Sequence, residues 1–197
     1  MKRGFLAGIT VSGALLLGKS LSSKPDSREF YVLTGAVATT WLAGASAAGP
    51  VHRGDRAVLA PAMTGAGAFA VFYAGALVAR RIPPLRRAIA GVLDYAHRGS
   101  TPSVVVTTLA NGAAEEVFFR GAVYSAAGAH PVRTSTAIYV LTTAATRNPA
   151  LVLASAVMGT LFGVQRRRSG GVQAPLVTHV VWSALMLTFM PRLFKDP

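Results

Sequence analysis

The sequence predicts an all-α, polytopic transmembrane helix bundle of about six to eight spans, with one amphipathic helix at the membrane interface. The chain is 52% hydrophobic and only 14% charged, and its mean hydropathy is +0.46. Its charges fall in short clusters between long uncharged runs. A transmembrane β-barrel would instead show segments of about ten residues with alternating polarity. The fold class therefore follows from composition and from the spacing of the charges.

The charge balance is strongly basic. Twenty Lys and Arg residues against seven acids give a net charge of +13. In a soluble protein this excess would suggest a nucleic-acid partner, but here the basic residues, including Arg166–Arg168, flank apolar runs. We therefore expect them to anchor the chain against anionic lipid headgroups, with membrane lipids and no nucleic acid as partners. The absence of cysteine excludes disulfides, thiolate metal sites and cysteine nucleophiles.

Three helices are predicted in the first part of the chain. The basic start at Lys2 and Arg3, followed by the apolar stretch 5–18, resembles a signal peptide but lacks an Ala-x-Ala cleavage site. A retained first helix is therefore expected. The runs 30–49 and 57–79 each reach the length of about 20 uncharged residues that a span requires. Both are rich in Gly and Ala, which lets helices approach closely.

The segment 80–98 differs from these runs because it is amphipathic. Leu85, Ile89, Val92 and Leu93 recur at helical spacing, and basic residues occupy the other faces. This pattern is typical of a helix that lies on the membrane rather than across it.

Four further apolar stretches follow. Residues 101–129 are long enough to cross a bilayer and form the central predicted helix. The stretches 134–146 and 150–165 are shorter, and they form either two short spans or a broken and partly re-entrant pair. The last predicted span covers residues 172–190.

The central helix carries three charges where none is expected. A charge near the centre of a bilayer costs about 2.5–3.5 kcal/mol on insertion scales, so Glu115, Glu116 and Arg120 indicate a functional site. Glu116 and Arg120 lie four residues apart and can pair on one helix face, whereas Glu115 points about 100° away and is available for chemistry. Asn111, one turn earlier, could donate a hydrogen bond to Glu115. Two alternatives remain open: a pair that only locks helices together, and a transporter or channel acid.

His179 is the histidine that falls inside a predicted span. It lies near the middle of 172–190, at about the depth of Glu115 in its own helix, and Ser183 follows on the same face. A carboxylate and an imidazole at matched depth could close around a water molecule, an arrangement that suggests hydrolysis by general-base catalysis. The alternative is a hydrogen bond that merely joins two helices.

These residues carry a resemblance. The run from Glu115 to Gly121 contains the motif EExxxR. A Gly-containing helix is expected at 159–163, a turn at 166–170 and a histidine-bearing helix at 174–183. Over residues 101–190, the chain resembles the CAAX protease and bacteriocin-processing (CPBP, abortive-infection-like) family of intramembrane endopeptidases. The sequence shows no internal repeat and no extramembrane domain, so we expect a single transmembrane domain, residues 1–197, with scaffold helices in 1–79. The resemblance implies that 101–190 contains the catalytic core helices.

The resemblance also implies residue roles. Glu115 would activate water for attack on a peptide bond, and Glu116 and Arg120 would orient it. His179 would stabilise the oxyanion or, in a metalloprotease interpretation, hold a metal. Ser183 stands where the HxxxN motif of the family has asparagine, and a serine can still donate a hydrogen bond. The expected protein is integral to a bacterial cell membrane and cleaves a membrane-associated peptide or protein, with or without a lipid anchor.

One expected motif is missing. The FxxxH motif of the family should lie between residues 134 and 149, and that stretch contains no histidine. A hydroxyl from Thr146 or Thr142 could substitute as a hydrogen-bond donor. Zinc requires three or four protein ligands in most sites, so we expect water activation without a metal or other cofactor, with a divalent metal as the less favoured possibility.

The missing histidine leaves two further functions open. The first is a catalytically silent relative that uses the same polar pocket to bind a peptide or protein partner. The second is a small proton-coupled transporter, which would need inverted repeats or matched interrupted helices. The sequence shows no such repeat.

Overall fold

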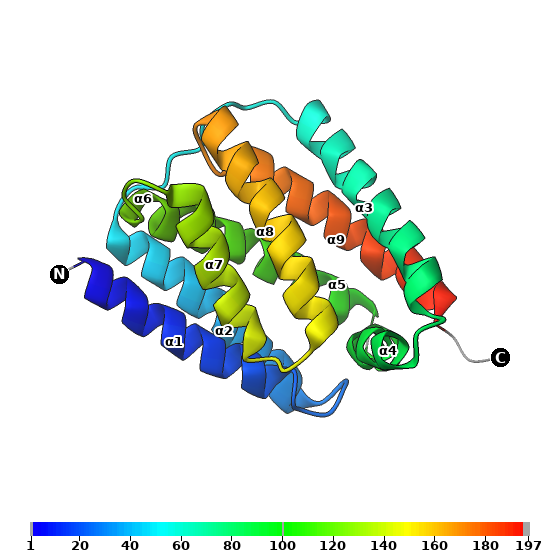
Figure 1. Ribbon diagram of the computed structural model, residues 1–197. Coiled ribbons are helices and arrows are strands. Elements are labelled where there is room, and N and C mark those ends of the chain that lie inside the picture. Colours follow the sequence, from blue (N-terminus) through cyan, green and yellow to red (C-terminus); the bar gives the residue numbers. More distant parts are fainter. Residues whose placement is uncertain (1, 100, 195–197) are drawn as a thin grey trace.

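The computed structural model describes residues 2–99 and 101–194, and this part of the chain forms a helical bundle without strands (Figure 1). The predicted all-α fold class is thereby confirmed. In chain order the elements are α1 (Lys2–Ser20), α2 (Arg28–Ala48), α3 (Leu59–Ala79), α4 (Pro83–Arg98), α5 (Thr101–Glu115), the π-helix η1 (Glu116–Val123), α6 (Tyr124–Ala126), α7 (Pro131–Ala144), α8 (Pro149–Ser169) and α9 (Gln173–Leu193).

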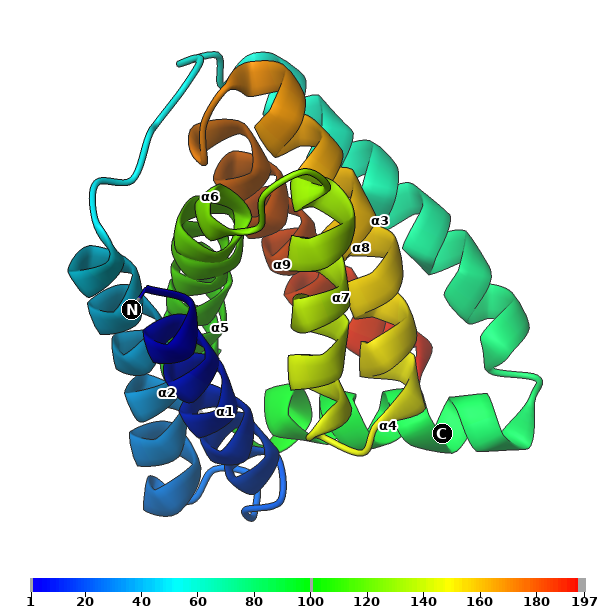
Figure 2. The same ribbon diagram turned by 60° about the vertical axis from the view of Figure 1, so that its left-hand side comes forward.

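Four of these helices are long and apolar enough to cross a membrane. Among the described residues they are α2, α3, α8 and α9, and the other long helices except α4 run beside them in the bundle (Figure 2). Large apolar side chains cover much of the outside, with Leu59 74%, Leu141 72% and Val71 69% exposed. Exposed apolar surface on this scale suits a hydrocarbon environment. The chain is therefore an integral membrane protein.

Helix α4 lies across one end of the bundle, in a different direction from the long helices (Figure 2). It begins with two prolines, whose fixed φ angles suit a first helical turn. The Tyr95 hydroxyl donates to the Ser23 carbonyl at 2.7 Å, and the Asn148 side chain donates to the Ala88 carbonyl at 2.8 Å. This placement agrees with the interfacial helix predicted from the amphipathic pattern.

Helices α7 and α8 form a hairpin of two separate helices. Arg147 adopts a positive φ of 56° in the turn, and the Asn148 side chain caps α8 by accepting hydrogen bonds from the N–H groups of Ala150 and Leu151. The two helices then pack along one another. Of the two arrangements left open by the sequence, the structure has two separate helices.

The connection between α2 and α3 is fixed to the turn between α8 and α9. His52 and Arg53 accept hydrogen bonds from the N–H groups of Val172 and Gln173 at 3.0 and 3.1 Å. Gly171 has no room for a side chain, because a Cβ atom there would collide with the backbone of Arg53. The loop thus holds the first turn of α9, the helix that carries the predicted functional histidine.

The first two helices pack directly against the charged central helix. Trp41 of α2 is fully buried, stacks on Phe118 with ring centroids 4.8 Å apart, and lies 5.1 Å from Phe119. Gly13 of α1 faces the Trp41 ring, and a side chain there would collide with it. Buried aromatic rings and small residues therefore join α1 and α2 closely to η1.

Candidate active site

The two glutamates lie where the central helix changes its winding. Helix α5 ends at Glu115, and η1 begins at Glu116. At the end of η1 the Tyr124 N–H donates to the carbonyl of Phe119, five residues earlier, which is the π-helical pattern. Short π segments inside α-helices occur frequently at functional sites. The sequence periodicity did not predict this change.

Glu116 accepts hydrogen bonds from two basic side chains. Arg120 Nη1 lies 3.3 Å from its Oε1 atom, and His179 Nδ1 lies 2.9 Å from the same oxygen. Glu116 and Arg120 are fully buried, and His179 is 5% exposed. The predicted Glu116–Arg120 pair is present. The direct partner of His179 is Glu116, however, whereas the sequence had suggested that this histidine closes on Glu115.

The Arg120 side chain is held in place by groups on α7 and α8. Its Nη2 donates to the Gly159 carbonyl at 3.1 Å, and its guanidinium lies 4.5 Å from the ring centroid of Tyr139 and 5.2 Å from that of Phe162. Cation–π contacts of a desolvated arginine are among the stronger ones. A Cβ atom on Gly159 would lie 3.2 Å from Nη2, so the glycine makes room for the cation.

A second arginine holds the backbone of η1. Arg166 Nε donates to the Arg120 carbonyl at 2.8 Å, and its guanidinium lies 4.9 Å from the ring centroid of Tyr124. Arg166 is 9% exposed, whereas Arg167 and Arg168 are exposed. The expectation that the whole triplet anchors the membrane interface is therefore wrong for Arg166, because its side chain is buried against η1.

Glu115 has a different environment from Glu116. It is half-buried, and the Tyr139 hydroxyl donates to its Oε2 atom at 2.7 Å. The sequence analysis did not single out Tyr139. Its position between residues 134 and 149, where the missing motif was expected, is the signal that could have identified it, since a phenol can donate to a carboxylate.

Glu115 and His179 line the same cavity, which has a volume of about 250 Å³. Gly112 lets the imidazole approach α5, because a Cβ atom there would lie only 3.2 Å from His179 Nε2. When Nδ1 carries the proton donated to Glu116, a neutral imidazole keeps Nε2 as an acceptor. The ring also stacks on Phe162 at 4.7 Å. The cavity is further lined by polar residues that include Thr34, Thr107, Thr108, Thr143, Thr146, Ser155 and Ser183.

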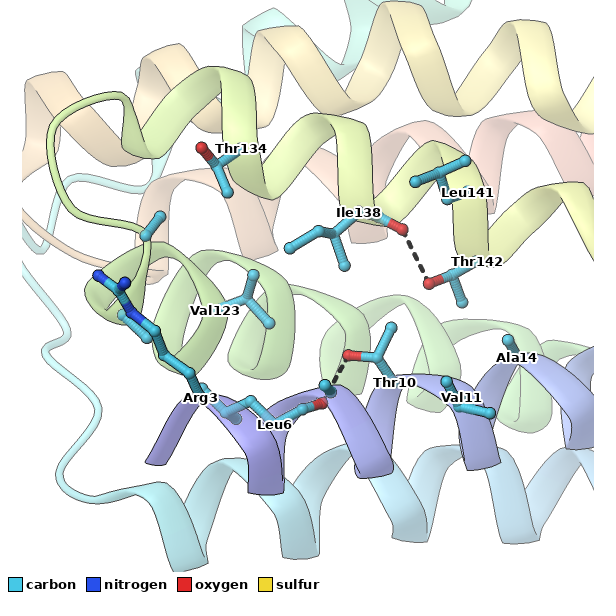
Figure 3. A pocket seen from close by; sticks show the side chains of 13 residues that line it. Arg3, Leu6, Thr10, Val11, Ala14, Val123, Thr134, Ile138, Leu141 and Thr142 are labelled. Carbon is cyan, nitrogen blue, oxygen red and sulfur yellow. Dashed lines mark hydrogen bonds between the residues drawn. The ribbon is translucent and has the colours of Figure 1, made fainter. Parts of the chain in front are cut away.

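The predicted supporting residues are only partly at this cavity. Ser183 is buried one turn after His179 and lines it, as does Thr146. Thr142 lines a different pocket, between α1 and α7 (Figure 3). Asn111 lines the cavity, but its amide donates to the carbonyls of Thr34 and Thr107 at 3.1 and 2.9 Å. Because both amide hydrogens are used, the expected hydrogen bond to Glu115 is not made.

The donor atoms at the cavity do not suit a zinc site. Within residues 2–99 and 101–194, no group of three or more His, Asp or Glu side chains could hold a metal ion. Glu115 and His179 face the cavity, while Glu116 is engaged by Arg120 and His179. Zinc sites in proteins use three or four protein ligands.

Comparison with known proteins identifies one family. Residues 97–185 match the family model described as Type II CAAX prenyl endopeptidase Rce1-like. Searches of curated proteins and of solved structures found no match. The matched segment runs from the end of α4 into α9 and includes both glutamates, Arg120 and His179, whereas α1–α3 precede it. Residues 97–185 of this integral membrane protein are therefore similar to the Rce1-like type II CAAX prenyl endopeptidases.

Proposed function

We propose that this chain is an intramembrane endopeptidase in which Glu115 activates a water molecule to hydrolyse a peptide bond of a membrane-associated substrate. The observation that carries the proposal is the shared cavity of Glu115 and His179, inside the segment that matches the protease family. The proposal treats residues 1–197 as one domain, with the helices of 1–79 as scaffold for the core in 101–190.

The proposed reaction begins with proton transfer. The Glu115 carboxylate takes a proton from water while the water oxygen attacks the carbonyl carbon of the peptide bond. The resulting tetrahedral oxyanion receives hydrogen bonds from groups at the cavity. The protonated Glu115 then gives its proton to the leaving nitrogen as the C–N bond breaks. The products are a carboxylic acid and an amine, and Glu115 returns to its starting state.

Tyr139 fits the role of a positioning residue for Glu115. Its hydroxyl donates a hydrogen bond to Oε2 of Glu115, and the second carboxylate oxygen remains available to a water molecule. The bond also fixes the rotamer of the carboxylate, and a fixed general base reacts without reorganisation.

His179 is proposed to lie closest to the oxyanion and to stabilise it. Glu116 accepts from Nδ1 and so sets the orientation of the ring, while Arg120 holds Glu116 in place. When the ring carries a proton on Nε2 as well as on Nδ1, Nε2 donates to the oxyanion instead of accepting. Ser183 and Thr146 line the same cavity and offer additional hydroxyl donors. This scheme needs no metal or other cofactor.

The substrate class follows from the family and the location of the site. The matched family consists of prenyl endopeptidases, so the proposed substrate is a peptide or protein at the membrane, with or without a lipid anchor. A bacterial cell membrane is the proposed location. Membrane lipids are the other partners, since exposed apolar faces surround the bundle.

The proposal is tested with a fluorogenic peptide that ends in a farnesylated CAAX sequence, presented to the full chain in lipid nanodiscs. We expect the wild-type protein to cleave it at one bond and, in H₂¹⁸O, to place one ¹⁸O atom in the new carboxylate. Glu115→Gln should abolish cleavage, and Glu29→Gln, an exposed acid outside the site, should not. Cleavage that survives in Glu115→Gln would exclude the role given to this residue.

A second function is favoured by one observation. The segment 134–149 has no histidine, and Ser183 replaces the expected asparagine, so the cavity has fewer strong donors than the family motif supplies. A catalytically silent relative would bind a peptide in the cavity and release it unchanged. Binding of the farnesylated peptide with the same affinity by wild type and Glu115→Gln, without any turnover, would support this second function over the first.

A further inference from the structure

A second pocket lies outside the proposed active site. It has a volume of about 550 Å³ and is formed by α1, by the end of the central helix and by α7 (Figure 3). It shares no lining residue with the cavity of Glu115 and His179. The walls are mainly apolar, and the hydroxyls of Thr10 and Thr142 donate to carbonyls of their own helices, Leu6 and Ile138. Such walls suit a hydrocarbon chain rather than a polar ligand.

The shape of this groove follows from the way α1 and α7 approach each other. At one end Gly18 packs against the backbone of Ala145, and a Cβ atom there would lie 2.6 Å from the Ala145 carbonyl oxygen. Towards their other ends the two helices separate, and the groove opens between them (Figure 3). Along α1 it extends from Arg3 to Ala14, which corresponds to about 16 Å at 1.5 Å per residue. Half of a hydrocarbon core of about 30 Å has nearly the same depth.

A cation stands at the open end of the groove. Arg3 is exposed and lines the pocket, with its guanidinium beside Gly128 in the turn between α6 and α7 (Figure 3). Among the residues that the structure describes, the acidic residue at this end of the bundle is Asp55, which is exposed. The same end also carries the exposed basic residues Arg53, Arg56, Arg133, Arg167 and Arg168.

We propose that this groove binds one anionic phospholipid, with an acyl chain between α1 and α7 and the phosphate at Arg3. The groove has the depth of one leaflet, and its cation lies where a headgroup would be. Basic residues next to a membrane favour anionic over zwitterionic lipids. The proposal concerns a lipid that remains bound, and it does not depend on the proposed peptidase activity.

The test uses native mass spectrometry of the full chain in detergent, with added phosphatidylglycerol or phosphatidylcholine of identical acyl chains. We expect about fivefold stronger retention of phosphatidylglycerol, because phosphatidylcholine carries the same phosphate but also a quaternary ammonium that Arg3 repels. Arg3→Gln should remove this preference. Arg53→Gln is the matched control, because it removes an equal charge at the same end without lining the groove.

A second pair of variants tests the apolar part. Ala14→Phe places a ring at the deep end of the groove and should reduce phosphatidylglycerol retention, whereas Gly8→Leu, which projects into open space, should leave it unchanged. Equal retention of both lipids, or equal loss of preference in Arg53→Gln and Arg3→Gln, would overturn the proposal. So would competition by inorganic phosphate, unchanged retention in Ala14→Phe, or retention of the farnesylated peptide in place of phosphatidylglycerol.

Discussion

Two neighbouring glutamates in this protein have contrasting surroundings. Glu116 is fully buried and accepts hydrogen bonds from Arg120 and His179. Glu115 is half-buried, lines a cavity and accepts from the neutral hydroxyl of Tyr139. A carboxylate shared by two basic groups contributes to the arrangement of helices, whereas one that faces a cavity can exchange a proton with a bound molecule. We infer from this contrast that Glu116 has a structural role and that Glu115 has a chemical one.

The largest loss of stability is expected when Glu116 is replaced. Glu116→Gln keeps the shape of the side chain but leaves Arg120 as a buried cation without a counter-charge, which should cost about 3 kcal/mol of unfolding free energy. Unfolding in mixed micelles with increasing dodecyl sulfate measures this loss. A stability within about 0.5 kcal/mol of wild type would remove the structural role assigned to Glu116.

A smaller loss is expected for Arg166→Gln. The substitution removes a charge-assisted hydrogen bond to the Arg120 carbonyl, worth about 1.5–3 kcal/mol, and the contact with Tyr124. Because η1 carries Glu116 and Arg120, turnover of the farnesylated peptide should also fall, by about tenfold in kcat with little change in KM.

Arg167→Gln provides the matched control for Arg166, because the two residues are adjacent and Arg167 is exposed. The Arg167→Gln substitution should change the unfolding equilibrium constant by less than a factor of two, and kcat by less than a factor of two. Guanidinium added to Arg166→Ala should restore part of kcat. Equal effects of the two glutamine variants would show that η1 does not depend on Arg166.

A modest effect is expected at Tyr139. Tyr139→Phe removes the hydroxyl that donates to Glu115 but keeps the ring beneath the Arg120 guanidinium. The lost hydrogen bond is worth about 1.5–3 kcal/mol at most, and water can replace part of it at the cavity. We expect kcat to fall by about threefold to tenfold at unchanged stability. A variant as active as wild type would contradict the positioning role of the hydroxyl.

Much of the fold could be predicted from the sequence because its helices are separated by clear signals. The long apolar runs between charge clusters gave α2, α3 and α9 to within a few residues, and the amphipathic pattern of 80–98 gave α4. Hydrophobic length and periodicity are local properties, so one sequence is sufficient for them.

The site was less predictable, because its geometry depends on how helices are rotated against one another. The four-residue spacing predicted the pair of Glu116 and Arg120. The similar depth of His179 and Glu115 in their helices predicted that both face one cavity, and both line it. Which glutamate His179 contacts depends on the rotation of α9 and on the π winding of η1, and neither leaves a local signal. Tyr139 was overlooked because a tyrosine within an apolar run usually serves packing.

The most direct test of the roles of Glu115 and Glu116 is the turnover and the unfolding of Glu115→Gln, measured in the same nanodiscs and micelles as Glu116→Gln. The account predicts that Glu115→Gln loses about 10²–10⁴-fold in kcat, the usual contribution of a general base, while its unfolding free energy stays within about 0.5 kcal/mol of wild type. A Glu115→Gln protein that keeps its turnover, or that unfolds as readily as Glu116→Gln, would contradict it.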